Sequence, residues 1–219
     1  MDESYTHITI ILDRTGSMES IRDDTIGGFN AFLREQQASP DRATLTLVQF
    51  DSQDPYEVIH EFTQITEVTV LDQQTYVPRA ATPLLDAIGR GINDLAQQIA
   101  NLAEKERPAK ILFVVVTDGK ENASCEFTRE QIVKMIGERQ EQDKWQFVFL
   151  SADLAAIREA EEIGFMRKKS LAFDKSAVGT SHAWDSLSDA ATFLRGPNKS
   201  EVEFNDKDRD RQDSERKRK

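Results

Sequence analysis

Short apolar runs rich in β-branched residues recur along this chain, and segments with helical spacing of apolar residues lie between them. Strands are usually 4–8 residues long, whereas helices run to about 10 or more, so run length separates the two. The apolar runs predict strands at residues 6–12, 44–50, 56–62, 111–117, 145–150 and 170–173. The amphipathic segments predict helices at residues 19–38, 83–105, 127–140, 154–163 and 179–194.

Strands that alternate with helices predict an α/β fold, a doubly wound and mostly parallel sheet with helices on both faces. The runs at 44–50 and 56–62 are separated by only a few residues, ending at Asp54-Pro55. Such a connection is too short for a parallel crossover, so we predict an antiparallel hairpin at one edge of the sheet. Within the first helix, Gly27-Gly28 predicts close packing of that helix on the sheet.

The length of 219 residues fits one substantial core and one domain. After Gly196-Pro197 the sequence becomes densely charged and poor in apolar residues. Such a composition leaves little burial to offset the entropy of ordering the chain. We therefore expect one domain over residues 1–196 and a charged, disordered tail over residues 197–219.

Candidate chemistry lies where the first predicted strand ends, in the run Asp13-Arg14-Thr15-Gly16-Ser17-Met18. One carboxylate and two hydroxyls alternate along a tight turn there. Ligands of open α/β sheets bind outside the carboxyl ends of the strands. Oxygen ligands of this kind suit hard cations such as Mg²⁺.

Two further loops bring similar side chains to the same predicted edge. Thr82-Pro83 opens the long second helix, and Asp118-Gly119 follows the strand at 111–117. Three loops in this order resemble those of the von Willebrand factor A family, with its metal-ion-dependent adhesion site. In that family the first loop reads Asp-x-Ser-x-Ser, the second carries a Thr, and the third carries an Asp before a Gly. Thr15 replaces the first Ser and keeps its hydroxyl.

The resemblance implies how each residue would act at the site. Thr15 and Ser17 would bind the cation directly, and Thr82 directly or through a water. Asp13 and Asp118 would balance its charge. The implied cation is Mg²⁺, with Mn²⁺ and Ca²⁺ as alternatives, and the implied ligand is a protein whose Asp or Glu completes the coordination.

The charge and the cysteine content limit which classes of partner and which cellular compartment fit the chain. The net charge is -11, which disfavours nucleic acid and anionic membranes as partners. No apolar run approaches the length of about 18 residues that a membrane span needs, and the first residues do not resemble a signal peptide. The single cysteine, Cys125, fits a reducing compartment, so we expect a cytoplasmic protein.

Catalysis is the competing hypothesis, because a metal-bound water can act as a nucleophile. The sequence offers no nucleophile-and-base arrangement, no phosphate-binding Gly-rich loop and no zinc-type spacing, and its three His are scattered. The main alternative is a metal-dependent aspartyl phosphotransferase of the haloacid dehalogenase type. That family needs an acid two residues after the nucleophile, where this chain has Thr15. A response-regulator receiver domain and a metal-free scaffold are two further alternatives. The main expectation is a binding module that is not an enzyme.

Four loop residues beside these positions are expected to contact the partner: Arg14, Lys120, Glu121 and Asn122. Arg14 is the strongest candidate for specificity, because a guanidinium group can hold a carboxylate with two hydrogen bonds. The expected setting is an adaptor within a multi-protein assembly.

Overall fold

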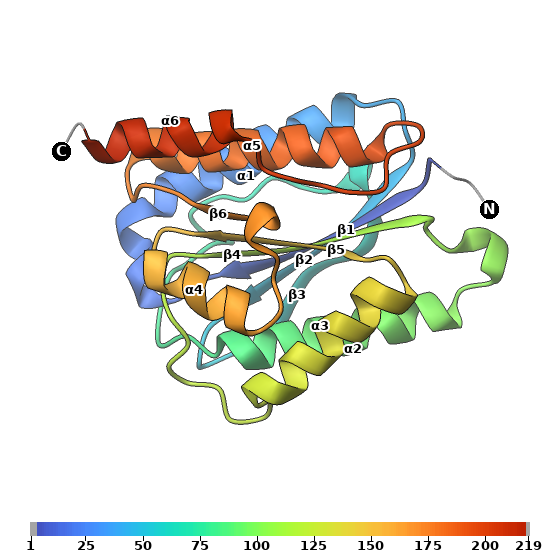
Figure 1. The fold of residues 1–219 in the computed structure, drawn as a ribbon, viewed down its shortest axis with the longest axis horizontal. Coiled ribbons are helices and arrows are strands. Elements are labelled where there is room, and N and C mark those ends of the chain that lie inside the picture. Colours follow the sequence, from blue (N-terminus) through green and yellow to red (C-terminus); the bar gives the residue numbers. More distant parts are fainter. Residues whose placement is uncertain (1–3, 218–219) are drawn as a thin grey trace.

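A single six-stranded sheet forms the centre of the computed structural model, which describes residues 4–217 (Figure 1). Its order is β3-β2-β1-β4-β5-β6; β2 and β3 are antiparallel, and the other neighbours are parallel. The predicted α/β class and the edge hairpin are therefore confirmed. The strands are β1 (Thr6–Asp13), β2 (Ala43–Phe50), β3 (Glu57–Gln64), β4 (Lys110–Thr117), β5 (Gln146–Ser151) and β6 (Ser170–Ala172).

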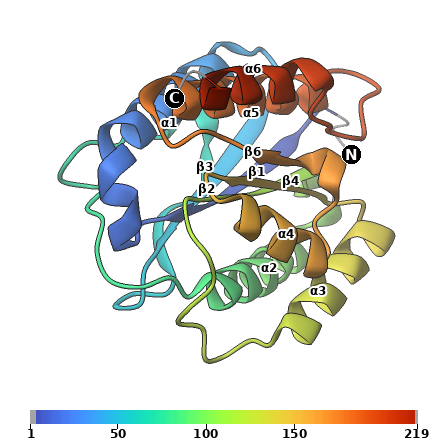
Figure 2. The ribbon, with the colours of Figure 1, turned by 60° about the vertical axis from the view of Figure 1, so that its left-hand side comes forward.

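Helices cover both faces of this sheet, as Figures 1 and 2 show from two directions. One face carries α1 (Arg22–Ala38), α5 (Ala177–Arg195) and α6 (Asp206–Lys217). The other carries α2 (Leu84–Asn101), α3 (Arg129–Gln142) and α4 (Leu154–Glu162). The first predicted helix begins as a 3-10 turn, η1 (Gly16–Ile21), and only then becomes α1. Among residues 4–217, no helix combines the length and the apolar character that crossing a membrane requires.

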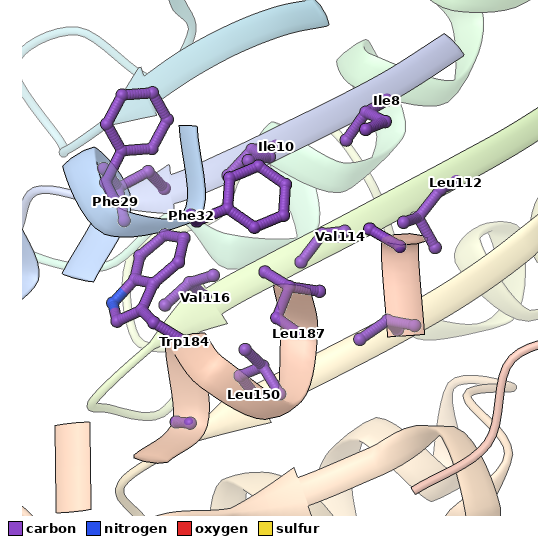
Figure 3. Close-up of a cluster of buried hydrophobic side chains, with 14 of the residues drawn as sticks. Ile8, Ile10, Phe29, Phe32, Leu112, Val114, Val116, Leu150, Trp184 and Leu187 are labelled. Carbon is purple, nitrogen blue, oxygen red and sulfur yellow. The ribbon is translucent and has the colours of Figure 1, made fainter. Parts of the chain in front are cut away.

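Alternation along the strands divides the core into two layers. On β4, Leu112, Val114 and Val116 pack in the cluster that contains α1 and α5, whereas Phe113 and Val115 pack in the cluster beneath α2 and α3. Figure 3 shows the first cluster, where the strand residues meet aromatic and aliphatic side chains of α1 and α5. Both faces of the central strands are apolar, which is why their sequences are nearly continuous apolar runs.

The chain reverses its direction of winding between β1 and β4. From β1 it continues to β2 on one side, and it returns to β4 on the other side of β1. In open α/β sheets the crevice outside the carboxyl ends of two such strands is where ligands bind. The residues that follow these two strands are Asp13, at the end of β1, and Asp118, directly after β4.

Gly28 packs against another helix rather than the sheet, so the predicted packing of the Gly27-Gly28 pair on the sheet is wrong. A Cβ atom added to Gly28 would lie 2.0 Å from Cδ1 of Trp184 on α5. A Cβ atom at Gly27 would meet nothing within 4 Å. The missing side chain at position 28 is what allows the indole of Trp184 to approach α1.

The expectation of a disordered tail is wrong for residues 197–217. Val202 and Phe204 are buried in the core cluster of α1 and α5, and α6 lies along α5 (Figures 1 and 2). Gln212 accepts a hydrogen bond from the backbone N–H of Asp174 at 3.0 Å and donates one to the carbonyl of Gly179 at 2.9 Å. The prediction from average composition failed because a few specific contacts hold this segment on the domain.

We predict that Phe204→Ala lowers the free energy of unfolding by about 3 kcal/mol, because truncating a buried aromatic leaves a cavity. Phe193→Ala is the matched control, since Phe193 is half exposed and should cost less than about 1 kcal/mol. Urea unfolding of both variants measures the difference. Equal losses in the two variants would contradict the packing of the C-terminal segment.

His7 should make folding stability depend on pH. Its ring is fully buried, stacks on Phe62 at 3.8 Å and meets the Thr44 hydroxyl at 2.8 Å. Burial lowers the pKa of His7 to about 3 from 6.5. The unfolded chain therefore binds a proton more readily than the folded chain, and stability falls as pH drops from about 6.5 towards 3.

His7→Gln should remove this part of the pH dependence. The stability of the wild type should drop more steeply than that of the variant below pH 6.5, by at most about 1.4 kcal/mol per pH unit. Urea unfolding at pH 7.5 and pH 5.5 gives the two slopes. A wild-type-minus-variant difference that stays constant over this range would contradict a neutral buried imidazole.

Candidate metal centre

Asp13 ends β1 beside Thr117, because the parallel register pairs Leu12 with Val116. Its Oδ1 accepts a hydrogen bond from the backbone N–H of Thr15 at 2.7 Å, and its Oδ2 accepts one from the hydroxyl of Thr117 at 2.5 Å. The side chain is fully buried. Burial raises the pKa of Asp13 to about 7, although the bonds from Thr117 and Thr15 pull it down. The negative charge of Asp13 is therefore poorly balanced by its surroundings, and a positive charge close to it would stabilise the carboxylate.

The two hydroxyls of the first loop turn towards Asp118. The Thr15 and Ser17 hydroxyl oxygens lie 3.2 Å apart, and Ser17 donates a hydrogen bond to Oδ1 of Asp118 at 2.5 Å. Ser17 belongs to η1, whereas Asp118 follows β4, so this bond joins two loops that are 101 residues apart in the chain. Four predicted site residues (Asp13, Thr15, Ser17 and Asp118) are thus brought together by the switch between β1 and β4.

Thr82 comes to the same place from the loop before α2. A Cβ atom added to Gly119 would lie 3.6 Å from the Ser17 hydroxyl and 3.9 Å from the Thr82 hydroxyl. Both hydroxyls therefore border the space above Gly119, where the lack of a side chain leaves room. The structure gathers all five predicted oxygen donors at one end of the sheet.

Lys175 is a site residue that the sequence did not reveal. It lies in the segment between β6 and α5, and its Nζ is 2.5 Å from Oδ2 of Asp118 and 2.9 Å from the carbonyl of Ser17. The Asp118 side chain is fully buried, whereas that of Lys175 is 36% exposed. The positive charge beside the Asp118 carboxylate and the Ser17 carbonyl is therefore supplied by the protein's own ammonium group. No local signal marks Lys175, since its partner Ser17 is 158 residues away.

The donor chemistry fits a hard divalent cation. Among the side chains that the structure describes, which leave out 215 and 216, no group of three or more His, Cys, Asp or Glu could hold a metal by itself. A cation here would depend on hydroxyl oxygens in addition to the two carboxylates of Asp13 and Asp118. Magnesium-type ions prefer oxygen ligands and few carboxylates, whereas zinc sites usually use nitrogen and sulfur.

Arg14 is buried, so its predicted role as the main partner contact is wrong. It is only 5% exposed, and its guanidinium group donates to Asp51 at 2.8 and 3.0 Å and also pairs with Glu57. Arg79 donates to the same Asp51 oxygen at 2.9 Å. Burial pushes the pKa of Asp51 upward, but the N–H of Gln53 and the two guanidinium groups lower it below its ordinary value. Arg14 therefore fastens the first loop to β2 and β3.

The other expected partner contacts lie on the loop that follows Asp118. The Glu121 carboxylate is occupied within the protein, because it accepts bonds from Ser124 and from the N–H groups of Ala123 and Leu85. Exposed Asn122 uses its Oδ1 to accept the N–H of Thr82 at 2.8 Å. Both residues position the loops. Lys120 is exposed, and its contact with a partner stays a prediction.

Asp86 holds the far part of this loop, and sequence reasoning missed it. Its buried carboxylate accepts the backbone N–H groups of Cys125, Glu126 and Phe127 at 2.8, 2.9 and 2.9 Å. The available signal was an acid in the first turn of α2, which ordinarily stabilises the positive end of its own helix. Here the carboxylate serves a neighbouring loop instead.

Solved structures with the same fold were found, although no protein-family model and no curated protein matches the chain. One is proximal thread matrix protein 1 from the mussel byssus, with a TM-score of 0.57, 13% identity and 86% of this chain covered. The chain spans 46% of that protein, whose structure is also known with a zinc-occupied MIDAS motif.

Two isolated domains are similar as well. The vWF domain of the Porphyromonas gingivalis pilus tip protein Mfa5 has a TM-score of 0.61 and 10% identity, with 89% of this chain and 97% of that domain covered. The SpRpn10 VWA domain has a TM-score of 0.52 and 10% identity, with 83% and 94% covered. The chain has the fold of von Willebrand factor A domains.

We predict that Arg14→Met lowers the free energy of unfolding by about 3 kcal/mol, because it removes both guanidinium bonds from Arg14 to the fully buried Asp51 and leaves the partly exposed Arg79 to balance that charge. Arg79→Met is the control, since Arg79 pairs with the same carboxylate but its side chain is 41% exposed. The control should cost about 1 kcal/mol or less. Urea unfolding measures both, and an equal cost would contradict a buried role for Arg14.

Proposed function

We propose that this domain binds a protein partner through a divalent cation held by Asp13, Thr15, Ser17, Thr82 and Asp118. The observation that carries the proposal is the short bond from Ser17 to Asp118, with the Thr82 hydroxyl beside the same glycine. Three separate loops thereby direct oxygen atoms to one place. The fold shared with adhesion and interaction domains supports this proposal.

Mg²⁺ is the proposed cation, with Mn²⁺ and Ca²⁺ as alternatives, because every donor is an oxygen. The bound cation would supply a coordination position that a carboxylate oxygen of the partner can occupy. The chain contributes two carboxylates and three neutral hydroxyls, so the loaded site would not carry an excess of negative charge. An Asp or Glu of the partner is therefore the matching ligand, and exposed Lys120 lies in the loop beside it.

We propose binding without turnover. Thr15 stands where an aspartyl phosphotransferase needs its second acid, and it uses its N–H on Asp13. His7 and His60 belong to β1 and β3, and the His60 ring is engaged with Thr69 at 3.1 Å. Thr15 therefore cannot supply the general acid that the phosphotransferase hypothesis requires at this position. A cytoplasmic adaptor within a multi-protein assembly remains part of this proposal.

Mg²⁺ or Mn²⁺ should raise the folding stability of the wild type by about 1.4 kcal/mol at ten times its dissociation constant. Asp118→Asn and Thr82→Val should remove this increment, because the first deletes a negative charge and one of two carboxylate oxygens, the second deletes a hydroxyl, and both keep the shape of the side chain. Glu104→Gln is the control, since Glu104 is an exposed acid just before β4, at the other end of that strand. Thermal unfolding with the cation and with EDTA gives each increment.

Two outcomes would overturn the proposal. A cation-dependent increment that survives in Asp118→Asn would place the cation elsewhere. Magnesium-dependent turnover of p-nitrophenyl phosphate that Asp13→Asn abolishes would establish the phosphotransferase alternative. Partner binding is tested separately, by proteins that the wild type retains in Mg²⁺ and releases in EDTA, with Thr82→Val as the control.

A further inference from the structure

Lys175 contributes a positive charge at the point where the proposed cation would be held. Its ammonium group pairs with Oδ2 of Asp118 at 2.5 Å and donates to the carbonyl of Ser17 at 2.9 Å. Oδ1 of the same carboxylate accepts the Ser17 hydroxyl. Both oxygens of Asp118 are thus engaged, one by a neutral donor and the other by a cation that belongs to the chain.

We infer that Lys175 is a tethered competitor of the divalent cation, so that loading the site displaces its ammonium group from Asp118. This inference rests on the proposed function. Two positive charges beside one carboxylate repel each other, and water screens this repulsion little at Asp118, whose side chain is fully buried. The same carboxylate therefore favours one cation at a time, and Lys175 regulates the site by lowering its affinity.

The backbone around Lys175 is fixed, so the side chain is the part that moves. Gln212 of α6 bridges the N–H of Asp174 and the carbonyl of Gly179. A Cβ atom at Gly179 would lie 2.2 Å from the carbonyl oxygen of Asp174, so this turn is tightly closed. The Lys175 side chain itself is 36% exposed and can swing into solvent. The expected exchange is therefore a local rotation of one side chain.

Calorimetric titration of Mn²⁺ into the wild type and Lys175→Met tests the competition. Losing a charge-assisted contact that opposes the cation should tighten binding about tenfold in the variant. Lys105→Met removes an equal charge from an exposed position before β4, at the other end of that strand, and should change the affinity by less than about threefold. Lys175→Gln repeats the measurement in case the methionine variant folds poorly.

A second readout follows the ammonium group directly. Acetylation of Lys175 by an excess of a water-soluble N-hydroxysuccinimide ester, followed by mass spectrometry, should speed up several-fold when Mn²⁺ is added. Acetylation of the exposed Lys105, at the other end of β4, should not change. This measurement distinguishes displacement of Lys175 from a general effect of charge.

The outcomes separate the two proposals. If Mn²⁺ binds the wild type and Lys175→Met equally and leaves the acetylation of Lys175 unchanged, the competition is overturned and the cation site stands. If Mn²⁺ binds neither protein, the proposed function fails together with this inference. Tighter binding in both Lys175 variants with faster acetylation in the wild type supports the tethered competitor.

Discussion

The parallel register of β1 and β4 is the constraint on which the site depends. It places Asp13 beside Thr117 and brings Asp118 within reach of the loop that follows β1. Two carboxylates at such a place are costly, because burial raises the pKa of Asp13 and the charge of Asp118 raises it further. The surrounding loops therefore supply hydrogen-bond donors to both carboxylates, and Lys175 supplies a positive charge.

The fold could be predicted because its strands are apolar on both faces. Runs such as 111–117 can be stable only inside a sheet covered by helices on both sides, and the short turn before β3 allowed only a hairpin. The five proposed ligands were accessible for the same reason. Each lies at the end of a strand, within a few residues after one, or just before a helix, so the order of the elements along the chain determines where it lies.

The supporting residues could not be predicted, because their partners are distant in the sequence. Arg14 has the appearance of an exposed loop residue until β2 and β3 bring Asp51 and Glu57 to it. Lys175 reaches Ser17 only after the whole sheet has formed. The C-terminal segment was misjudged because its few buried groups, such as Phe204, carry more weight than its average charge.

The contact between Gly28 and Trp184 limits how the helices can move when a ligand binds at the carboxyl ends of β1 and β4. η1, which contains Ser17, leads directly into α1, and the segment that contains Lys175 leads directly into α5. The indole of Trp184 packs against the backbone of Gly28. If α5 slides along α1, this buried ring loses its packing contacts with Gly28 and Phe29. A displacement that passes from η1 or from the Lys175 segment into these two helices must therefore rotate the pair together or break the contact. Tryptophan fluorescence would distinguish these two routes.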